Sequence, residues 1–509
     1  MIKISFLLVN FLLLFFSAKA QVINGFVSIT DSSYNSFLRS APPKVTGKIL
    51  NASKTELSNL KISYSLVTPF KEIQSTRISK VDSDGIFILK IDYPLPYQQI
   101  WLQIGDYFYT AIYANKDLII ELDLFELKRS NVDFYNNGVR YGGADGDFNT
   151  FMNKSMLYKR ETQLDISREI DKLSFNNDNF LEHTDSLFYI KKRLDEEFVA
   201  LNPSPYASVL ENERLSEYYE KVLMGCLIKG VVPSFWDTIK KHRTYLISNS
   251  SMIFYKTLYK FFKYSQLKSN FKGDALHYEI AQMDSVFGQT YSDILKMQIH
   301  SNDILENQKF LEVVNTSIKT PWVKVLLKKQ FNLSHEKILY VNKVLEEAKE
   351  LPVDIKLGNP LTELPFGAKL YVLEEGIKPE DLLATLKSSF NSKAIVLDFW
   401  ATWCEPCIKE MPYSKTLQQE AKNLPIEFIY ICTDNTSSID RWRNKIIELK
   451  QPGTHLFVDQ YLTGALMALF GKSAFPSYVS INQSGQVVKD NIQHMSSANL
   501  EDLKKLLRK

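Results

Sequence analysis

The chain has few cysteines, little excess of either charge and no long apolar run outside its N-terminus. Four cysteines among 509 residues are too few for a disulfide-dense scaffold. The formal net charge of +3 gives no electrostatic reason to expect a nucleic-acid partner. No segment after the N-terminus is long and apolar enough for a polytopic membrane protein. With 45% hydrophobic and 23% charged residues, the composition predicts a folded protein of about three domains.

The first 20 residues have the features of a secretory signal peptide. Lys3 supplies the basic start, residues 6–16 form an apolar stretch interrupted by Asn10, and Ala18-Lys19-Ala20 is a small-x-small cleavage site. The apolar stretch is shorter than the about 20 residues of a spanning helix, and an uncleaved anchor is the alternative. We therefore expect a protein of the periplasm or cell envelope, with no transmembrane segment after signal cleavage.

Residues 21–146 have a pattern typical of β-strands. Residues 62–66 and 118–124 largely alternate apolar and polar side chains, which is the period of a half-buried strand. Asp84-Gly85 precedes the apolar residues 86–89 and predicts a plain hairpin. A calcium loop is the alternative there, but the ligand spacing of such a loop is missing. This segment is expected to form a β-sandwich.

Residues 147–350 are expected to form helices. They contain four glycines and four prolines, whereas average usage would give about two dozen in all. One apolar stripe with steps of three and four residues predicts a helix that ends before Pro203. Its members are Leu187, Ile190, Leu194, Phe198 and Leu201. A second stripe consists of Ile338, Val341, Val344 and Ala348.

From residue 351 onward, short strands alternate with helices. The strand candidates are residues 394–400, 426–432, 477–481 and 486–488. The helix candidates are residues 405–422, residues 436–449 and a closing helix from Leu500 with Ser497 as its N-cap. Strands that alternate with helices imply a sheet covered on both faces.

The reactive residues are concentrated in Cys404-Glu405-Pro406-Cys407, directly after the strand candidate 394–400. A cysteine at a helix start faces unpaired amides and the positive end of the helix dipole, which favours its thiolate. Pro406 fits the first helical turn because it has no amide hydrogen to lose. Cys407 follows three residues later on the same helix face, close enough for a disulfide with Cys404. The pair can therefore exchange with a disulfide of another protein.

Two alternatives to a redox pair are a structural disulfide and half of a zinc site. A zinc site needs two further ligands at regular spacing. The remaining cysteines, Cys226 and Cys432, are single, and the seven histidines are scattered. We expect Cys226 and Cys432 to be small buried core residues. We therefore expect neither a metal nor a cofactor.

The sequence around the two cysteines is more specific than their spacing. It is Phe399-Trp400-Ala401-Thr402-Trp403-Cys404-Glu405-Pro406-Cys407, followed by Lys409-Glu410-Met411-Pro412, and it resembles the exported TlpA/ResA-type branch of the thioredoxin family. The resemblance covers residues 351–509 and implies an α/β thioredoxin-like domain. Residues 21–146 resemble the β-sandwich that precedes many exported thioredoxin-like proteins of Bacteroidetes type. The expected fold is thus multidomain, with an N-terminal β-sandwich, a central all-α domain over residues 147–350 and a C-terminal thioredoxin-like domain.

The resemblance also assigns roles to single residues. Cys404 would be the attacking thiolate and Cys407 the resolving thiol of a redox disulfide. Phe475-Pro476 precedes the strand candidate 477–481 and matches the family's cis-proline, which faces the dithiol and pairs with substrate backbone. The expected client-binding residues are Trp403, Glu405, Pro406, Phe475 and Pro476.

Two acids are candidates for proton transfer. Asp398 interrupts an apolar strand six residues before Cys404, where burial would raise its pKa and suit it to accept the proton of Cys407. The exported branch often has asparagine at this position, and a strand-end acid that reaches solvent is the alternative. Glu410, three residues after Cys407, matches an acid typical of the branch, and a solvated helix acid is the alternative.

Glu405 also bears on the direction of electron flow. Its negative charge beside Cys404 opposes thiolate formation, which predicts a site at the reducing end. The first hypothesis is a periplasmic disulfide reductase that acts on disulfide-containing exported proteins and receives electrons from a membrane partner. The alternatives are a disulfide oxidase or isomerase, and an envelope-binding protein with an auxiliary redox domain.

Overall fold

The structure is a computed structural model that divides into two compact units. The first unit comprises Met1–Ile299 and Val313–Leu327, and the second comprises His300–Glu312 and Lys328–Lys509. The described residues are 26–38, 41–70, 74–105, 107–130, 135, 137–161, 169, 179–266, 274–301, 303–349, 357–488 and 491–507. The predicted signal peptide at residues 1–20 lies outside them. Among these residues, no helix has the length and apolar character needed to cross a bilayer.

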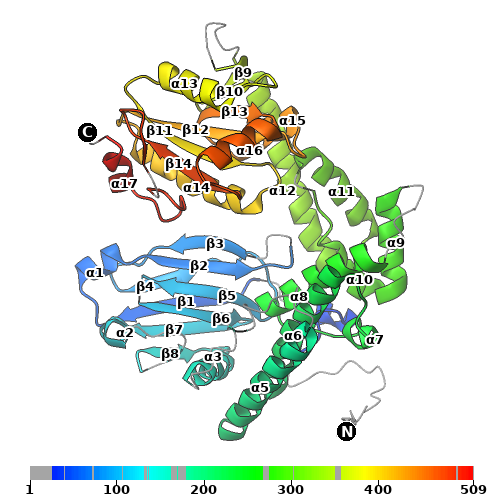
Figure 1. Ribbon diagram of the computed structural model, residues 1–509. Coiled ribbons are helices and arrows are strands. Elements are labelled where there is room, and N and C mark those ends of the chain that lie inside the picture. The colour runs from blue at the N-terminus through cyan, green and yellow to red at the C-terminus, as the bar shows by residue number, and fades with distance from the viewer. Residues whose placement is uncertain are drawn as a thin grey trace, which may run out of the picture. The chain divides into compact units, whose positions relative to one another are not determined.

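Eight strands of the first unit form two four-stranded sheets, ordered β4-β1-β7-β8 and β3-β2-β5-β6. The strands are β1 (Lys44–Leu50), β2 (Ile62–Val67), β3 (Gln74–Ser79), β4 (Ile86–Leu89), β5 (Gln98–Ile104), β6 (Phe108–Ala114), β7 (Asp117–Asp123) and β8 (Val139–Gly142). One apolar core takes Val45 and Leu118 from the first sheet and Ile62 and Ile100 from the second. Because alternate side chains of both sheets enter this core, the strands make a β-sandwich (Figure 1).

The turn at Asp84-Gly85 does not close a hairpin. β3 pairs with β2, whereas β4 pairs with β1, so the chain passes from one sheet to the other at this turn. Gly85 has a φ of 78°, and its N–H donates to the carbonyl of Asp82 at 3.1 Å. The hairpin prediction is therefore wrong. The residues of a turn predict that the chain changes direction, but they do not predict which strand the following segment pairs with.

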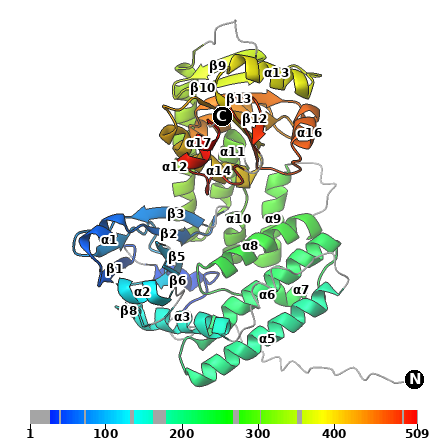
Figure 2. The same cartoon turned by 60° about the vertical axis from the view of Figure 1, so that its left-hand side comes forward.

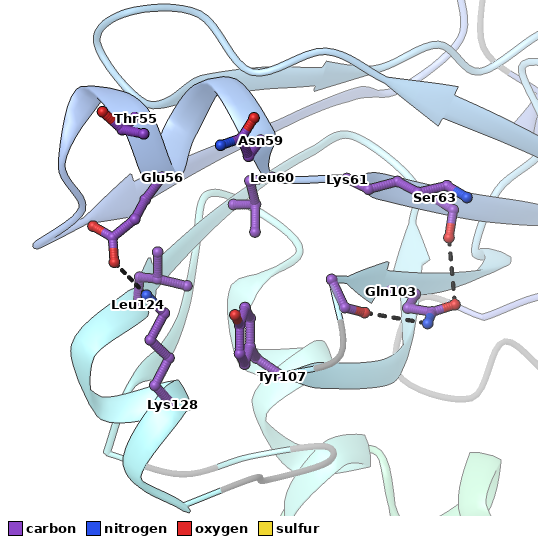
Figure 3. A pocket seen from close by; sticks show the side chains of 11 residues that line it. Thr55, Glu56, Asn59, Leu60, Lys61, Ser63, Gln103, Tyr107, Leu124 and Lys128 are labelled. Atoms are coloured by element: carbon purple, nitrogen blue, oxygen red, sulfur yellow. Dashed lines mark hydrogen bonds and ion pairs between the residues drawn. The ribbon is translucent and has the colours of Figure 1, made fainter. Parts of the chain in front are cut away.

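The sandwich carries a surface pocket of about 440 Å³. Tyr107 lies on one side of it, and Lys128 forms an ion pair with Glu56 across it (Figure 3). The hydroxyl of Ser63 donates to the side chain of Gln103 at 3.4 Å. Two of the pocket's charged groups, Glu56 and Lys128, are thus paired with each other.

The helices of the first unit follow or flank the sandwich. They are η1 (Ser32–Phe37), α1 (Lys54–Asn59), α2 (Leu124–Ser130), α3 (Gly146–Glu161), α5 (Phe180–Leu201), α6 (Ala207–Lys229), α7 (Trp236–Ile239), α8 (Asn249–Phe261), the π-helical η2 (Phe262–Gln266), α9 (Ala275–Phe287) and α10 (Gln289–Lys296). α5 and α6 run side by side in both views (Figures 1 and 2). α5 ends before Pro203, as predicted, and it buries Leu194 and Phe198, whereas Leu201 is exposed.

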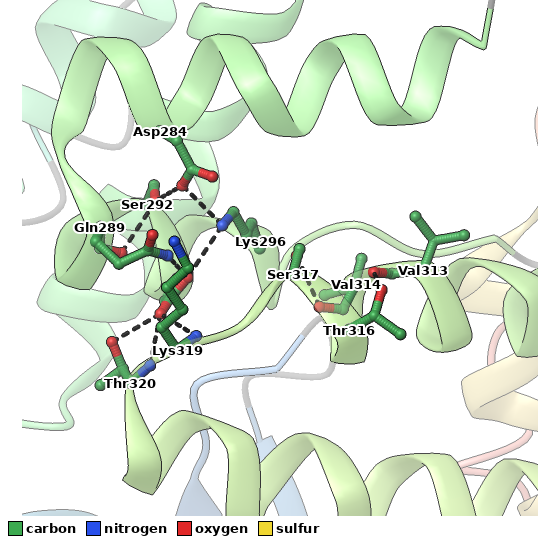
Figure 4. Close-up of polar contacts among 11 residues, drawn as sticks. Asp284, Gln289, Ser292, Lys296, Val313, Val314, Thr316, Ser317, Lys319 and Thr320 are labelled. Atoms are coloured by element: carbon green, nitrogen blue, oxygen red, sulfur yellow. Dashed lines mark hydrogen bonds and ion pairs between the residues drawn. The ribbon is translucent and has the colours of Figure 1, made fainter.

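A buried lysine stabilises the end of α10 and the segment that follows α11 (Ile304–Ser317). Nζ of Lys296 lies 2.7 Å from Asp284 and 3.0 Å from Asp293. The second carboxylate oxygen of Asp293 accepts the backbone N–H groups of Lys319 and Thr320 at 3.0 and 2.8 Å (Figure 4). Burying these charges is tolerable because each has an opposite charge or a hydrogen-bond donor beside it. The bonds fix the backbone immediately before α12 (Pro321–Glu346).

A seven-stranded sheet forms the centre of the second unit, with the order β15-β14-β11-β12-β13-β10-β9. Its strands are β9 (Asn359–Leu364), β10 (Ala368–Val372), β11 (Ala394–Trp400), β12 (Ile426–Thr433), β13 (Gly453–Val458), β14 (Ser477–Ile481) and β15 (Val487–Val488). β11, β12, β13 and β10 are parallel to their neighbours in this series, and β14 is antiparallel to β11. The predicted strands therefore occur, together with β9, β10 and β13, which were not predicted.

Helices cover both faces of this sheet, as the alternation of strands and helices predicts (Figure 1). They are α13 (Pro379–Ser389), α14 (Glu405–Glu420), α15 (Ile439–Leu449), α16 (Gln460–Leu469) and α17 (Leu500–Lys505). One core contains Met411 of α14, Trp442 of α15 and Leu503 of α17, and the opposite core contains Leu382 of α13 and Leu462 of α16.

One local feature of the second unit, the start of α17, differs from expectation. The N-cap of α17 is Asn499, whose side chain accepts the N–H groups of Glu501 and Asp502, so the prediction of Ser497 is wrong. The hydroxyl of Ser497 instead donates to the carbonyl of His494 at 3.1 Å.

The division between the units passes through α11 and α12, inside the segment expected to form a separate helical domain. The domain boundaries 21–146, 147–350 and 351–509 stay predictions.

Candidate active site

Cys404 and Cys407 form a disulfide at the start of α14. β11 ends at Trp400, and after three residues Cys404 occupies the N-cap position of the helix. The Cα atoms of the two cysteines are 5.3 Å apart, within the ordinary range for a disulfide. Cys404 is 4% exposed and Cys407 is 1% exposed. Cys404 is thus the slightly more exposed of the two, which is the order expected if it attacks an external disulfide.

The start of α14 favours a thiolate on Cys404. The backbone N–H of Cys407 donates to Sγ of Cys404 at 3.2 Å, and the helix dipole points its positive end at the same atom. Glu405 follows directly and forms an i,i+4 ion pair with Lys409 at 3.3 Å. Both side chains of this pair are exposed, so solvent screens the pair and it contributes little stability. The charge of Glu405 nevertheless lies one residue from the sulfur.

Trp403 and Phe475 form an aromatic surface beside the disulfide. Their ring centroids are 5.9 Å apart in an edge-to-face arrangement, and Trp403 is 41% exposed. The peptide bond between Phe475 and Pro476 is cis. Ser477, the next residue, pairs with Phe399 of β11, so Pro476 lies at the same end of the sheet as the disulfide. Pro406 is exposed in the first turn of α14. The expected client-binding residues are thus brought together around Cys404.

Asp398 is buried on the face of the sheet that α14 covers. Side chains alternate along a strand, and Val396 and Trp400 share a core with Cys407, so Asp398 between them points to the same side. It is 3% exposed, and among the described residues its Oδ1 has no hydrogen-bond partner. Burial, with a smaller contribution from the charge of Glu410, raises the pKa of Asp398 to about 8. This carboxyl does not reach solvent.

Glu410 is held by a residue that the sequence did not indicate. The backbone N–H of Ser496 donates to one carboxylate oxygen of Glu410 at 3.0 Å, and the hydroxyl of Ser496 donates to the other at 2.8 Å. Ser496 lies 86 positions away in the chain, in the segment before α17. No local pattern marks such a residue, because a lone serine in a loop has many uses. The two bonds hold the carboxylate of Glu410 in one orientation.

The remaining cysteines take no part in the disulfide. Cys226 and Cys432 are both buried and unpaired. Burial raises the pKa of the Cys432 thiol well above its ordinary value, so this thiol stays protonated and unreactive. Within the described part of the chain, no group of three or more His, Cys, Asp or Glu side chains is arranged to hold a metal ion.

Comparisons with known proteins agree with this geometry. Residues 378–507 match the Redoxin family model. Thiol-disulfide oxidoreductase ResA of Bacillus thuringiensis subsp. konkukian is 31% identical over 118 residues, which are 23% of this chain and 65% of that protein. ResA of Bacillus subtilis is 27% identical over 161 residues, which are 30% of this chain and 86% of that protein. The chain spans 65% of the length of the first of these relatives.

Two solved structures are similar to part of this chain. The thioredoxin domain of a thiol-disulfide oxidoreductase from Bacteroides vulgatus is 20% identical and covers 23% of this chain and 79% of its own, with a TM-score of 0.20. A thiol:disulfide interchange protein from Chlorobium tepidum is 20% identical and covers 24% and 83%, with a TM-score of 0.21. The family and sequence matches confirm the resemblance to the TlpA/ResA-type branch for the C-terminal region, which carries a Redoxin domain with a thioredoxin-like fold.

Proposed function

We propose that this chain is a thiol–disulfide oxidoreductase of the periplasm or cell envelope that reduces disulfides of exported proteins. The observation that carries the proposal is the Cys404–Cys407 disulfide at the start of α14, with the buried carboxyl of Asp398 on the sheet face beneath it. The names of the ResA relatives and the Redoxin match support this reaction class. The location rests on the signal-like residues 1–20.

In the proposed reaction, the Cys404 thiolate attacks one sulfur of a client disulfide. A mixed disulfide forms, and the other client sulfur leaves as a thiolate. When Asp398 is ionised, having given its own proton to solvent, Cys407 loses its proton to this carboxylate and attacks Sγ of Cys404. This closes the Cys404–Cys407 disulfide and releases the second client sulfur as a thiolate. Two electrons pass from the dithiol to the client, and solvent protonates the client thiolates.

Asp398 suits the proton-transfer step because of its burial. Its pKa of about 8 lies close to the ordinary pKa of a thiol, about 8.5, so a proton can move between the two groups in either direction. Glu410, held by Ser496, contributes the charge that raises the pKa of Asp398 further. An unshifted carboxylate would be too weak a base to take a proton from Cys407 at neutral pH.

A reductase must be reduced again after each turnover. In the proposed cycle, a membrane protein supplies two electrons and two protons through a dithiol of its own, and its oxidised form carries the new disulfide. Trp403, Phe475 and Pro476 would contact the client or this donor, because they lie at the same end of the sheet as the disulfide.

The test is turbidimetric reduction of insulin with dithiothreitol, in which the mature chain is compared with Cys404→Ser. We expect Cys404→Ser to lose the activity, because it removes the attacking sulfur. Cys226→Ser is the matched control, since this buried cysteine belongs to the first unit and should leave the rate unchanged. Equal rates for the wild type and Cys404→Ser would remove the enzymatic proposal.

The direction of electron flow is tested by a redox titration of the Cys404–Cys407 pair. A reductase should have a potential near that of thioredoxin, about −270 mV, whereas an oxidase should lie near about −120 mV. Glu405→His should move the potential to a less negative value, because it replaces a charge that opposes the Cys404 thiolate. A wild-type value at the oxidising end would reverse the assignment to a disulfide oxidase or isomerase.

A further inference from the structure

A cavity of about 330 Å³ opens beside the redox disulfide. One side is formed by Thr402 and Trp403, the two residues before Cys404, and the other by residues that precede α11 and by α15. The lining side chains used below are His300, Ser301, Asp303, Thr402, Trp403 and Arg441. All of them belong to the second unit. Nothing in the motif around the cysteines indicates that His300, Ser301 and Asp303, about a hundred positions earlier, line a cavity beside it.

Arg441 of α15 fixes the far wall of the cavity. Its Nε lies 3.5 Å from Oδ2 of Asp303, and its Nη2 lies 3.3 Å from Oε2 of Glu306. Oδ1 of Asp303 accepts the backbone N–H groups of Leu305 and Glu306 at 3.1 and 2.8 Å, and so caps the start of α11. One guanidinium therefore fastens the capped end of α11 to the thioredoxin-like fold.

The near wall is fixed as well. The indole N–H of Trp403 donates to the carbonyl of Asn435 at 2.8 Å, and the hydroxyl of Thr402 is 2.7 Å from that of Ser437. Held in this way, the half-exposed ring of Trp403 gives the cavity one apolar surface among polar side chains. A pocket of a few hundred cubic ångströms with an aromatic wall and several placed polar groups is typical of a binding site.

We propose that this cavity binds the polypeptide segment that flanks the attacked cysteine of a client protein, and that it makes the enzyme prefer protein disulfides to small ones. The inference rests on the proposed function. A chain bonded to Cys404 must continue past Trp403, which lines the cavity. The lining carries the imidazole of His300 and the guanidinium of Arg441, and these polar groups suit the backbone carbonyls and polar side chains of an extended segment. A small disulfide that reaches the Cys404 sulfur does not extend far enough to use them.

The experiment compares two substrates, insulin as the protein disulfide and 5,5′-dithiobis(2-nitrobenzoate) as the small one, with the full mature chain reduced beforehand. Arg441→Ala should lower kcat/KM for insulin by about tenfold, mainly through a higher KM, because it releases one wall of the cavity. The rate with the small disulfide should stay within about twofold of the wild type, since the dithiol is untouched. Arg443→Ala is the matched control, because this arginine lies on the same helix and pairs locally with Asp440 at 2.8 Å.

A second variant guards against a change of fold in Arg441→Ala. His300→Ala shortens an exposed side chain that lines the cavity and should give a smaller loss of the same kind, with His335→Ala, an exposed histidine of α12, as its control. If both cavity variants reduce insulin as the wild type does, or lose both substrates equally, the cavity proposal is overturned. The proposed function then still stands as long as Cys404→Ser is inactive, and it fails only if Cys404→Ser keeps its activity.

Discussion

At the scale of single residues, Asp398 shows most directly how burial creates chemistry. An aspartate in the middle of an apolar strand loses hydration, and at Oδ1 of Asp398 no hydrogen-bond partner among the described residues replaces it. The pKa of the carboxyl is therefore raised to about 8, so the group stays protonated up to a higher pH. The same burial that makes it a useful base in the proposed reaction costs stability whenever the group is ionised.

We predict that Asp398 makes the unfolding free energy fall as pH rises. The folded-state pKa of about 8 lies above the ordinary 3.8, so between about pH 4 and pH 8 the folded chain keeps a proton that the unfolded chain has lost. The contribution of Asp398 is therefore fully present below pH 4 and is lost by about pH 8. A pKa difference of this size corresponds to on the order of 5 kcal/mol. Asp398→Asn should remove this loss and be more stable than the wild type at pH 9.

The measurement is denaturant unfolding of the disulfide form at pH 5, 7 and 9. Asp440→Asn, which neutralises an exposed carboxyl in the same unit, should keep the pH dependence of the wild type. A difference between Asp398→Asn and the wild type that is the same at all three values would mean that Asp398 is not protonated in the folded chain.

At the scale of elements, glycines in helices have opposite effects according to their neighbours. Gly225 of α6 faces Phe180 of α5, and a Cβ built there would lie 2.1 Å from the phenyl ring. Gly464 of α16 is also helical, and a Cβ there would meet nothing within 4 Å. Close packing of α5 on α6 thus requires the first glycine, whereas packing places no such demand on the second.

We predict that Gly225→Ala destabilises the protein and that Gly464→Ala stabilises it. The first change forces a methyl group into the ring of Phe180 and should cost about 1–3 kcal/mol of unfolding free energy. The second improves helix propensity without a clash and should add up to about 1 kcal/mol. Denaturant unfolding of the two variants beside the wild type measures both effects. If both variants were stabilised, or both destabilised, packing against Phe180 would not explain the effect of Gly225→Ala on the free energy of unfolding.

At the scale of the whole molecule, α12 contributes to two cores. Trp322, near its start, belongs to the first unit, whereas Val341 and Val344, near its end, share a core with Trp442 in the second unit. The stripe predicted from the sequence is therefore present, and Ile338, Val341, Val344 and Ala348 all pack in the core of the thioredoxin-like fold. The helical segment before residue 351 is in this respect part of the structure that holds the redox site.

We predict that Val341→Asp destabilises the second unit although it lies outside the Redoxin match. Val341 is 3% exposed, and an unpaired charge there should cost about 3 kcal/mol or more. Leu339→Asp on the same helix is the control, because Leu339 is 56% exposed and its replacement should stay within about 0.5 kcal/mol. The readout is the midpoint of thermal unfolding of the full chain, with insulin reduction as a second measure. Equal midpoints for the two variants would mean that Val341 of α12 does not stabilise this core.

The sequence by itself determined the local structure around the disulfide. A strand of apolar residues followed by cysteine, proline and cysteine specifies β11 and the start of α14, and these elements begin where the pattern predicts. Periodicity also located α5, β2, β7 and β14, because each reports the face that its own element buries. The pattern did not locate β13 or α16, whose apolar runs are short.

Only the tertiary structure decided which distant residues meet. Ser496 reaches Glu410, Arg441 reaches Asp303, and β4 pairs with β1 instead of β3, although no local pattern links these partners. The physical reason is that a hydrophobic pattern indicates which face of a helix or strand is buried, but it does not indicate which other element packs against that face. Hydrogen bonds and ion pairs between loops depend on how the packed elements bring those loops together, and this is settled when the cores form.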